Sequence, residues 1–169
     1  MKPRAYYHRL RADYTPANLR TIFLFESPPV SGKYFYDPSG KTTEPLFSAI
    51  MRLFGWAPSA KAEGLALFRD AGYVLVDATY RQVNGMTKTE RRRIMREDYG
   101  SLVQDLRTFG DVEIIVGMVG VLDAVGERLV TDGFRVINNG RRIPFPSNGQ
   151  QRRFHEMALE VLAEREMAG

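Results

Sequence analysis

The feature that most constrains the fold is a fourfold alternation of short apolar runs with longer amphipathic segments. The apolar runs are Thr21–Phe25, Tyr73–Asp77, Val112–Val116 and Phe134–Ile137. Continuous apolar runs of this length are typical of strands covered on both faces. The repeated order of strand and helix therefore predicts an α/β fold of three α/β/α layers, with a central four-stranded, mainly parallel sheet.

The segments between the runs have helical spacing. Helices are expected to begin at Thr43-Glu44-Pro45, at Ala60, at the capping-box pattern of Thr87 and Glu90, after Gly117, and at Ser147 or Asn148. The helix after Thr87 is expected to continue as one element through Leu106. Residues 1–17 are basic, contain tyrosines and have no clean period, so we expect an N-terminal arm or a short helix packed across the domain.

Length and composition restrict the class of protein. A chain of 169 residues is long enough for one core, so residues 1–169 are predicted to form a single domain, as a monomer. The absence of cysteine excludes disulfides, thiolate zinc sites and iron–sulfur clusters, and two distant histidines make a metal site unexpected, so no cofactor is predicted. No apolar run approaches the ~20 residues that cross a bilayer, which predicts a cytoplasmic protein without membrane contact.

The charge is unevenly placed. The whole chain carries a net charge of +4, and the segment from Phe134 to Phe154 contains five arginines and no acidic residue. Such a segment is either a solvated basic surface or a face that attracts a polyanion such as DNA.

Two acidic residues stand at the carboxyl ends of predicted strands. Glu26 follows the first run and enters a loop with Ser27 and Pro28, and Asp77 ends the second run. Neighbouring parallel strands bring such residues to one edge of the sheet, where open α/β sheets bind ligands. The pair is therefore a candidate for acid–base catalysis. Either acid could instead cap a loop or pair with an arginine, and for Asp77 both readings stay open.

Other motifs near this loop suggest further chemistry. Phe35, between Tyr34 and Tyr36, could stack on a planar ligand such as a nucleobase, or could cover the core. Gly40-Lys41-Thr42 ends like a phosphate-binding loop, but Phe35 stands where the first glycine is required, which favours a simple turn before a helix. Ser27 and Ser147 lack the surroundings of a nucleophile elbow.

The order of these motifs resembles the uracil-DNA glycosylase superfamily. The first strand followed by Glu26-Ser-Pro-Pro29, Gly32 and Phe35 is similar to that family's first motif, a strand, a short acidic loop and a base-stacking aromatic residue. Phe145-Pro-Ser-Asn-Gly-Gln150, before the last helix, is similar to its last motif, usually His-Pro-Ser-Pro. The similarity of order spans roughly residues 20 to 162.

The resemblance implies a uracil-DNA glycosylase-like fold and hydrolysis of the N-glycosidic bond of a uracil-like or deaminated base flipped out of DNA. Glu26 then activates water and Asp77 reads the base edge. The implied base-binding residues are Ser27, Pro28, Phe35 and Tyr36, and the implied DNA-binding residues are Lys33, Arg81, Ser147, Asn148, Gly149, Gln150, Arg152 and Arg153. Because Phe145 occupies the position of the motif histidine, the expected activity is weak, directed at a different damaged base, or absent.

Two alternatives remain open. A non-catalytic nucleic-acid-binding module would keep the fold and the basic face without the chemistry. An enzyme acting on free nucleosides or nucleotides would use the same carboxylate without DNA.

Overall fold

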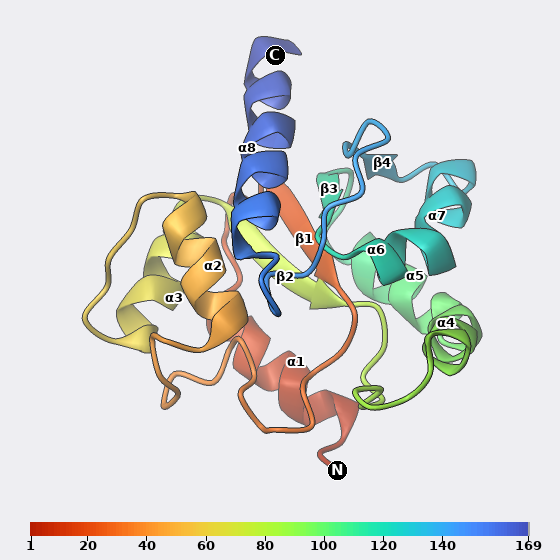
Figure 1. The fold of residues 1–169 in the computed structure, drawn as a ribbon, viewed down its shortest axis with the longest axis horizontal. Coiled ribbons are helices and arrows are strands. Elements are labelled where there is room, and N and C mark those ends of the chain that lie inside the picture. The colour runs from red at the N-terminus through yellow and green to blue at the C-terminus, as the bar shows by residue number, and fades with distance from the viewer. Residues whose placement is uncertain (169) are drawn as a thin grey trace.

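The computed structural model describes residues 1–168 and is built on a parallel sheet of four strands in the order β2–β1–β3–β4 (Figure 1). The strands are β1 (Thr21–Phe25), β2 (Tyr73–Asp77), β3 (Glu113–Val116) and β4 (Arg135–Val136). Every residue of β1 and β2 is buried, as continuous apolar runs predict. The predicted α/β architecture with a four-stranded parallel sheet is confirmed.

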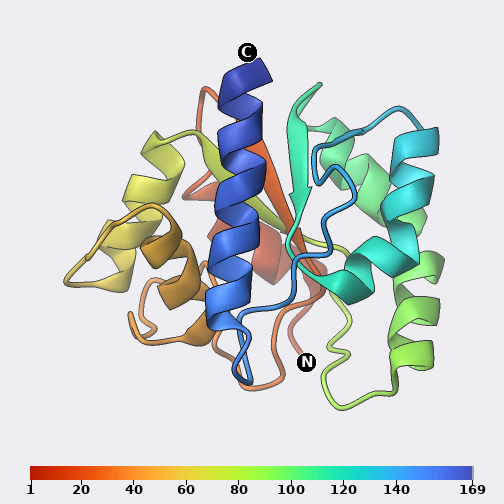
Figure 2. The ribbon, with the colours of Figure 1, turned by 45° about the horizontal axis from the view of Figure 1, so that its top comes forward.

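Helices cover both faces of the sheet. The helix α8 (Gln151–Ala168) crosses the front of the sheet in Figure 2, whereas α1 (Arg4–Ala12) and α5 (Tyr99–Arg107) lie behind it. The remaining helices are α2 (Pro45–Leu53), α3 (Lys61–Asp70), α4 (Lys88–Glu97), α6 (Val119–Val121) and α7 (Glu127–Thr131), and a π-helical turn, η1 (Leu122–Gly126), joins α6 to α7.

The helix expected from Thr87 through Leu106 is two helices. The capping box of Thr87 and Glu90 forms as predicted at the start of α4, but the chain bends at Asp98, between α4 and α5. The Asp98 carboxylate accepts hydrogen bonds from Arg81 and from Thr79 (2.6 Å). These contacts link the bend to the loop after β2, which helical periodicity cannot indicate.

Three other boundaries differ from the prediction. The last helix begins at Gln151 and not at Ser147 or Asn148, because Asn148 and Gly149 have positive φ angles of 50° and 83° that no helix continues. The fourth strand keeps only Arg135 and Val136 of the predicted run, which pair with Glu113 and Ile114 of β3. The expected helix after Gly117 contains the π-helical turn.

The N-terminal arm is ordered as a short helix packed across the domain, which confirms that part of the prediction. Arg11 of α1 is buried and forms a two-pronged ion pair with Asp105 of α5, at 2.6 and 2.8 Å. Tyr7 of the same helix packs edge-on against Tyr34, with ring centroids 4.8 Å apart. The helix thus reaches the aromatic segment that follows β1. No helix within residues 1–168 is long and apolar enough to cross a membrane.

Candidate functional site

A cavity of about 510 Å³ opens at the carboxyl ends of β1 and β2. The strand register explains its position, because Phe25 of β1 pairs with Asp77 of β2 and Glu26 follows directly. The predicted site residues that line the cavity are Glu26, Ser27, Lys33, Phe35, Asp77, Ser147 and Asn148. The two carboxylates expected at one edge of the sheet therefore share one cavity, together with residues of the loop after β1 and of the loop before α8.

Arg91 of α4 holds the Glu26 carboxylate. Its Nε lies 3.1 Å from each carboxylate oxygen of Glu26, and its Nη2 donates a further, short hydrogen bond to Oε1. Glu26 is only 6% exposed, so the ion pair is largely shielded from solvent. A guanidinium in this forked geometry fixes the direction of the carboxylate as well as its position. Arg91 itself lines the cavity.

Three buried polar atoms in this region have no hydrogen-bond partner. They are Ser27 Oγ, Tyr34 OH and Asp77 Oδ2, and within residues 1–168 no other buried side-chain nitrogen or oxygen lacks one. All three residues line the cavity. Leaving a buried polar atom unpaired costs about 1–3 kcal/mol, and such atoms call for a specific explanation. Their convergence on one cavity indicates a site for a polar ligand.

Burial strongly raises the pKa of Asp77. The side chain is 4% exposed, and desolvation raises its pKa to about 7. The positive charge of Arg11 offsets this rise only in part, and the negative charges of Asp105 and Glu26 add to it. The carboxyl can therefore hold or release a proton near neutral pH. Tyr34 stays protonated, because desolvation raises the pKa of its hydroxyl well above the ordinary value.

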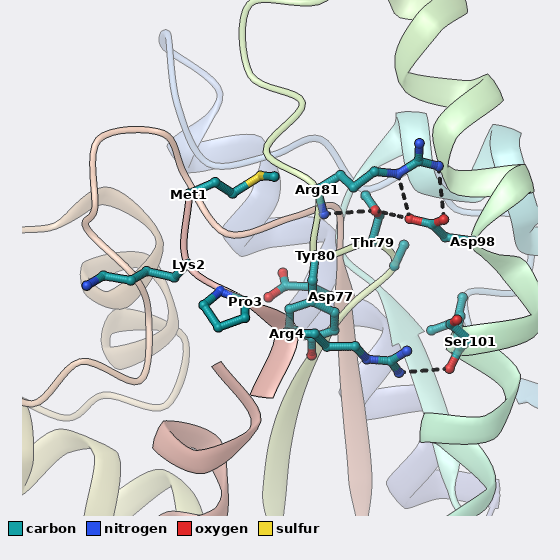
Figure 3. Close-up of a pocket in the computed structure, with 12 residues that line it drawn as sticks. Met1, Lys2, Pro3, Arg4, Asp77, Thr79, Tyr80, Arg81, Asp98 and Ser101 are labelled. Atoms are coloured by element: carbon teal, nitrogen blue, oxygen red, sulfur yellow. Dashed lines mark hydrogen bonds and ion pairs between the residues drawn. The ribbon is translucent and has the colours of Figure 1, made fainter. Parts of the chain in front are cut away.

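Asp77 also borders a second, smaller pocket on the side of the N-terminus (Figure 3). This pocket of about 270 Å³ is formed by the segment Met1–Arg4, the residues after β2 and the bend at Asp98. Figure 3 shows Arg81 in this pocket, forked onto Asp98. Arg81 also pairs with Glu97. Arg81 was predicted to bind DNA; the structure places it outside the larger cavity, paired with two carboxylates.

Aromatic side chains form the walls of the cavity. Phe35 is 3% exposed, lines the cavity and packs against Phe47 and edge-on against Phe68. Phe145, which the resemblance placed at the position of a motif histidine, packs edge-on against Phe25 with ring centroids 6.0 Å apart, and both line the cavity. Position 117, after β3, has room only for glycine, because a Cβ there would lie 2.5 Å from the Phe25 ring.

Two predicted base-binding residues do not line the cavity. Tyr36 is completely buried, and its hydroxyl accepts a hydrogen bond of 2.7 Å from the Leu75 N–H. Tyr36 is therefore a core residue, bonded to the backbone of β2. Pro28 is also buried and is not among the residues that line the cavity.

A buried ion pair shapes the loop that carries Tyr34 and Phe35. Lys61 of α3 is 1% exposed, and its Nζ lies 2.7 Å from Glu44 Oε2 and 2.6 Å from the Tyr34 carbonyl oxygen. Glu44, just before α2, lines the cavity and also accepts the Lys41 N–H. Gly40 sits against the same pair, and a Cβ there would lie 3.0 Å from Lys61 Nζ. The glycine–lysine pair is thus a turn before a helix, and not a phosphate loop.

Most arginines of the basic segment are neutralised by neighbouring acids. Arg141 pairs with Glu160 and Glu164, Arg142 with Asp123, Arg152 with Glu156 and Arg135 with Glu113. The net positive charge that this segment presents at the surface is therefore smaller than its five arginines suggest, because acids from other elements lie beside most of them. Arg152, Arg153, Gly149 and Gln150, which were predicted to bind DNA, are exposed and lie outside the cavity.

The phosphate site predicted at the start of the last helix does not lie at a helix N-terminus. The Ser147 N–H donates to the Phe145 carbonyl at 2.8 Å, and the Gln150 N–H donates to the Ser147 carbonyl at 3.0 Å. These bonds form a turn before α8 begins. Ser147 and Asn148 therefore face the cavity from a loop, and not from the first turn of a helix.

Sequence reasoning did not assign roles to several residues of the site. Arg91 was given no role, although it lies one helical turn before the buried Met95 and so on the inward side of α4. Tyr34 and Asn84 line the cavity from loops, where no periodicity indicates direction. Lys61 carries no sequence signal at all, because a lysine at a helix start is ordinarily exposed.

Within residues 1–168 no group of three or more histidine, cysteine, aspartate or glutamate side chains is placed to hold a metal ion. Comparison with known proteins found no matching family model, no matching curated protein and no matching solved structure. The site is therefore interpreted from its own chemistry.

Proposed function

We propose that the protein hydrolyses the N-glycosidic bond of a nucleobase, with a uracil-like or deaminated base flipped out of DNA as the substrate. The observation that carries the proposal is the convergence of unpaired Ser27 Oγ, Tyr34 OH and Asp77 Oδ2 on an aromatic-walled cavity beside Glu26. A nucleobase matches this surface, because its faces pack on apolar side chains while its edge carries hydrogen-bond donors and acceptors.

The four groups divide the chemistry between them. Glu26 accepts a proton from a water molecule as the water oxygen bonds to the sugar carbon, and its charge stabilises the cation-like sugar. The carbon–nitrogen bond breaks, and its electron pair leaves with the base. Asp77, which keeps a proton near neutral pH because burial raises its pKa to about 7, donates that proton to the departing base. Tyr34 and Ser27 hold the base edge.

This division supplies a proton donor that the family motif lacks here. The histidine position is occupied by Phe145, which packs on Phe25 and carries no proton. A protonated Asp77, at the carboxyl end of β2, takes the place of that donor.

The decisive experiment compares Glu26→Gln with the intact protein on oligonucleotides containing uracil, hypoxanthine or xanthine, with strand scission by alkali as the readout. We expect cleavage at one of these bases by the intact protein and a loss of at least about 100-fold in Glu26→Gln, the size of a general-base contribution. Glu166→Gln, an exposed carboxylate at the end of α8, is the matched control and should retain full activity. Equal activity of Glu26→Gln and Glu166→Gln would exclude the mechanism.

A second candidate, the same hydrolysis on free nucleosides or nucleotides, is favoured by one observation. Four arginines of the segment from Phe134 to Phe154 are paired with acids, which leaves less positive charge to hold a DNA strand. Release of free base from nucleosides or nucleotides, measured by chromatography, with no release from oligonucleotides would select this candidate.

A further inference from the structure

A third cavity, of about 260 Å³, adjoins the proposed base cavity and has a different character. It is lined by four cationic and two anionic side chains, namely Lys88, Arg91, Arg92, Arg142, Glu26 and Asp123. It shares Glu26, Arg91 and Met118 with the larger cavity. The Glu26–Arg91 ion pair is therefore the boundary between an aromatic cavity and a basic one.

Two of the cations, Arg92 and Arg142, are held in place by one carboxylate. Asp123 accepts two hydrogen bonds from Arg142, at 2.7 and 3.0 Å, and one from Arg92 at 2.9 Å. The hydrogen bond from Arg142, together with the positive charges of Arg142, Arg92 and Lys88, lowers the pKa of Asp123. A single carboxylate thus gathers guanidinium groups from α4 and from the loop before α8. Each guanidinium has more N–H donors than these bonds use.

The backbone of this cavity is also unusual. Asp123 belongs to the π-helical turn η1, and Gly120 lies just before it. π-Helical turns inside α-helices occur frequently at functional sites. At Gly120 a Cβ would lie 3.8 Å from Glu26 Oε2, so this part of the helix approaches the carboxylate closely. The cavity thus brings Glu26, the widened turn and the gathered cations together.

We propose that the basic cavity is a phosphate subsite that binds the sugar-phosphate part of the substrate. The inference rests on the proposed function, because it is the cleaved bond beside Glu26 that divides the substrate into a base in the larger cavity and a sugar-phosphate in the basic one. Forked guanidinium groups and an ammonium group are the donors that proteins use for phosphate. The ligand is a phosphate ester of a pentose, from a nucleic-acid strand or from a free nucleotide.

Binding is tested by NMR titration of the isotope-labelled full chain with three probes. They are deoxyribose, deoxyribose 5-phosphate, and a single-stranded oligonucleotide with a central tetrahydrofuran abasic analogue. We expect the Nε–H signals of Arg92 and Arg142 to shift with a phosphate-bearing probe and to stay in place with deoxyribose. A shift with deoxyribose 5-phosphate identifies a nucleotide as the source of the phosphate, and a shift with the oligonucleotide alone identifies a strand.

Variants separate this site from general electrostatics. Lys88→Gln and Arg142→Gln should each weaken binding of the phosphate-bearing probe about tenfold, which is the loss of a charge-assisted hydrogen bond. Arg93→Gln is the matched control, because Arg93 lies on the same helix, is exposed and pairs with Glu97 away from the cavity. The affinity of Arg93→Gln for the phosphate-bearing probe should change less than twofold. Lys88 is also exposed, so its variant should keep the native spectrum even if Arg142→Gln perturbs the fold.

The outcomes distinguish this inference from the function on which it rests. Phosphate-dependent shifts at Arg92 and Arg142 without cleavage at any base would support the phosphate subsite and exclude the proposed hydrolysis. Base cleavage that is unaffected by Lys88→Gln and Arg142→Gln would overturn the subsite and keep the hydrolysis. Absence of shifts with every probe, or equal weakening by Arg93→Gln, would also overturn the subsite.

Discussion

Asp77 is the residue whose chemistry depends most on its surroundings. It ends the edge strand β2, with one carboxylate oxygen unpaired and its pKa raised to about 7. In the unfolded chain the same group has an ordinary pKa of 3.8. A buried carboxylate that binds its proton more tightly in the folded state stabilises the fold only while the proton is bound, so the contribution is complete below pH 3.8 and is lost as the pH rises through 7.

The residue scale therefore yields a prediction for Asp77→Asn. The amide cannot ionise, so the variant should gain stability relative to the intact protein as the pH rises. Between pH 5 and pH 8 the difference in unfolding free energy should shift in favour of Asp77→Asn by about 2–3 kcal/mol, measured by urea denaturation at each pH. A difference that is constant across this range would contradict the raised pKa.

Among the elements, α3 and α4 determine the site although neither carries a predicted catalytic residue. The α4 helix supplies Arg91 to Glu26 and Arg92 to Asp123. The α3 helix supplies Lys61, which is buried against Glu44 and the Tyr34 carbonyl. The contacts of Arg91 and Lys61 attach the loop between β1 and α2 to the rest of the domain. The strands therefore determine where the cavity lies, and the helices determine its shape.

Lys61→Met tests this role of α3. The change leaves the Glu44 carboxylate buried without its cation, and breaking such a pair costs about 3–5 kcal/mol of unfolding free energy. Urea denaturation of the full chain measures the loss. The double variant Lys61→Met with Glu44→Met removes both charges and should recover most of the stability, because well-packed apolar side chains can replace a buried pair. A double variant less stable than Lys61→Met would contradict this account.

Across the whole molecule, the distribution of charge differs from the one suggested along the sequence. In the sequence, the five arginines between Phe134 and Phe154 suggest a basic face. In the structure, acids from β3, η1 and α8 neutralise Arg135, Arg141, Arg142 and Arg152. A nucleic-acid strand that meets Arg135, Arg141 or Arg152 would therefore release few counterions by contact with them.

The salt dependence of oligonucleotide binding measures this effect. Five arginines contacting a single strand would give a slope of log K against log salt near −3.5, since each contact contributes about −0.7. We expect a slope of about −1 to −2, because most of these arginines are already paired. Fluorescence anisotropy with a labelled oligonucleotide between 50 and 200 mM salt provides the slope. A value near −3.5 would show that the ion pairs open on binding.

The sequence by itself determined the layout of the sheet and the place of the site. Apolar runs of strand length alternating with amphipathic segments leave a parallel sheet as the arrangement that buries both faces, and the register of parallel strands then brings Glu26 and Asp77 to one edge. The capping box of α4 is similarly local, because a few consecutive residues carry the signal.

Only the tertiary structure decided which side chains meet at that edge. Arg91 reaches Glu26 across 65 positions of sequence, and Lys61 reaches Tyr34 across 27. Such pairs depend on how helices and loops pack, and periodicity carries no information about packing partners. The same reason explains why Tyr36 belongs to the core, why Arg81 is paired with Asp98, and why most arginines of the basic segment are neutralised.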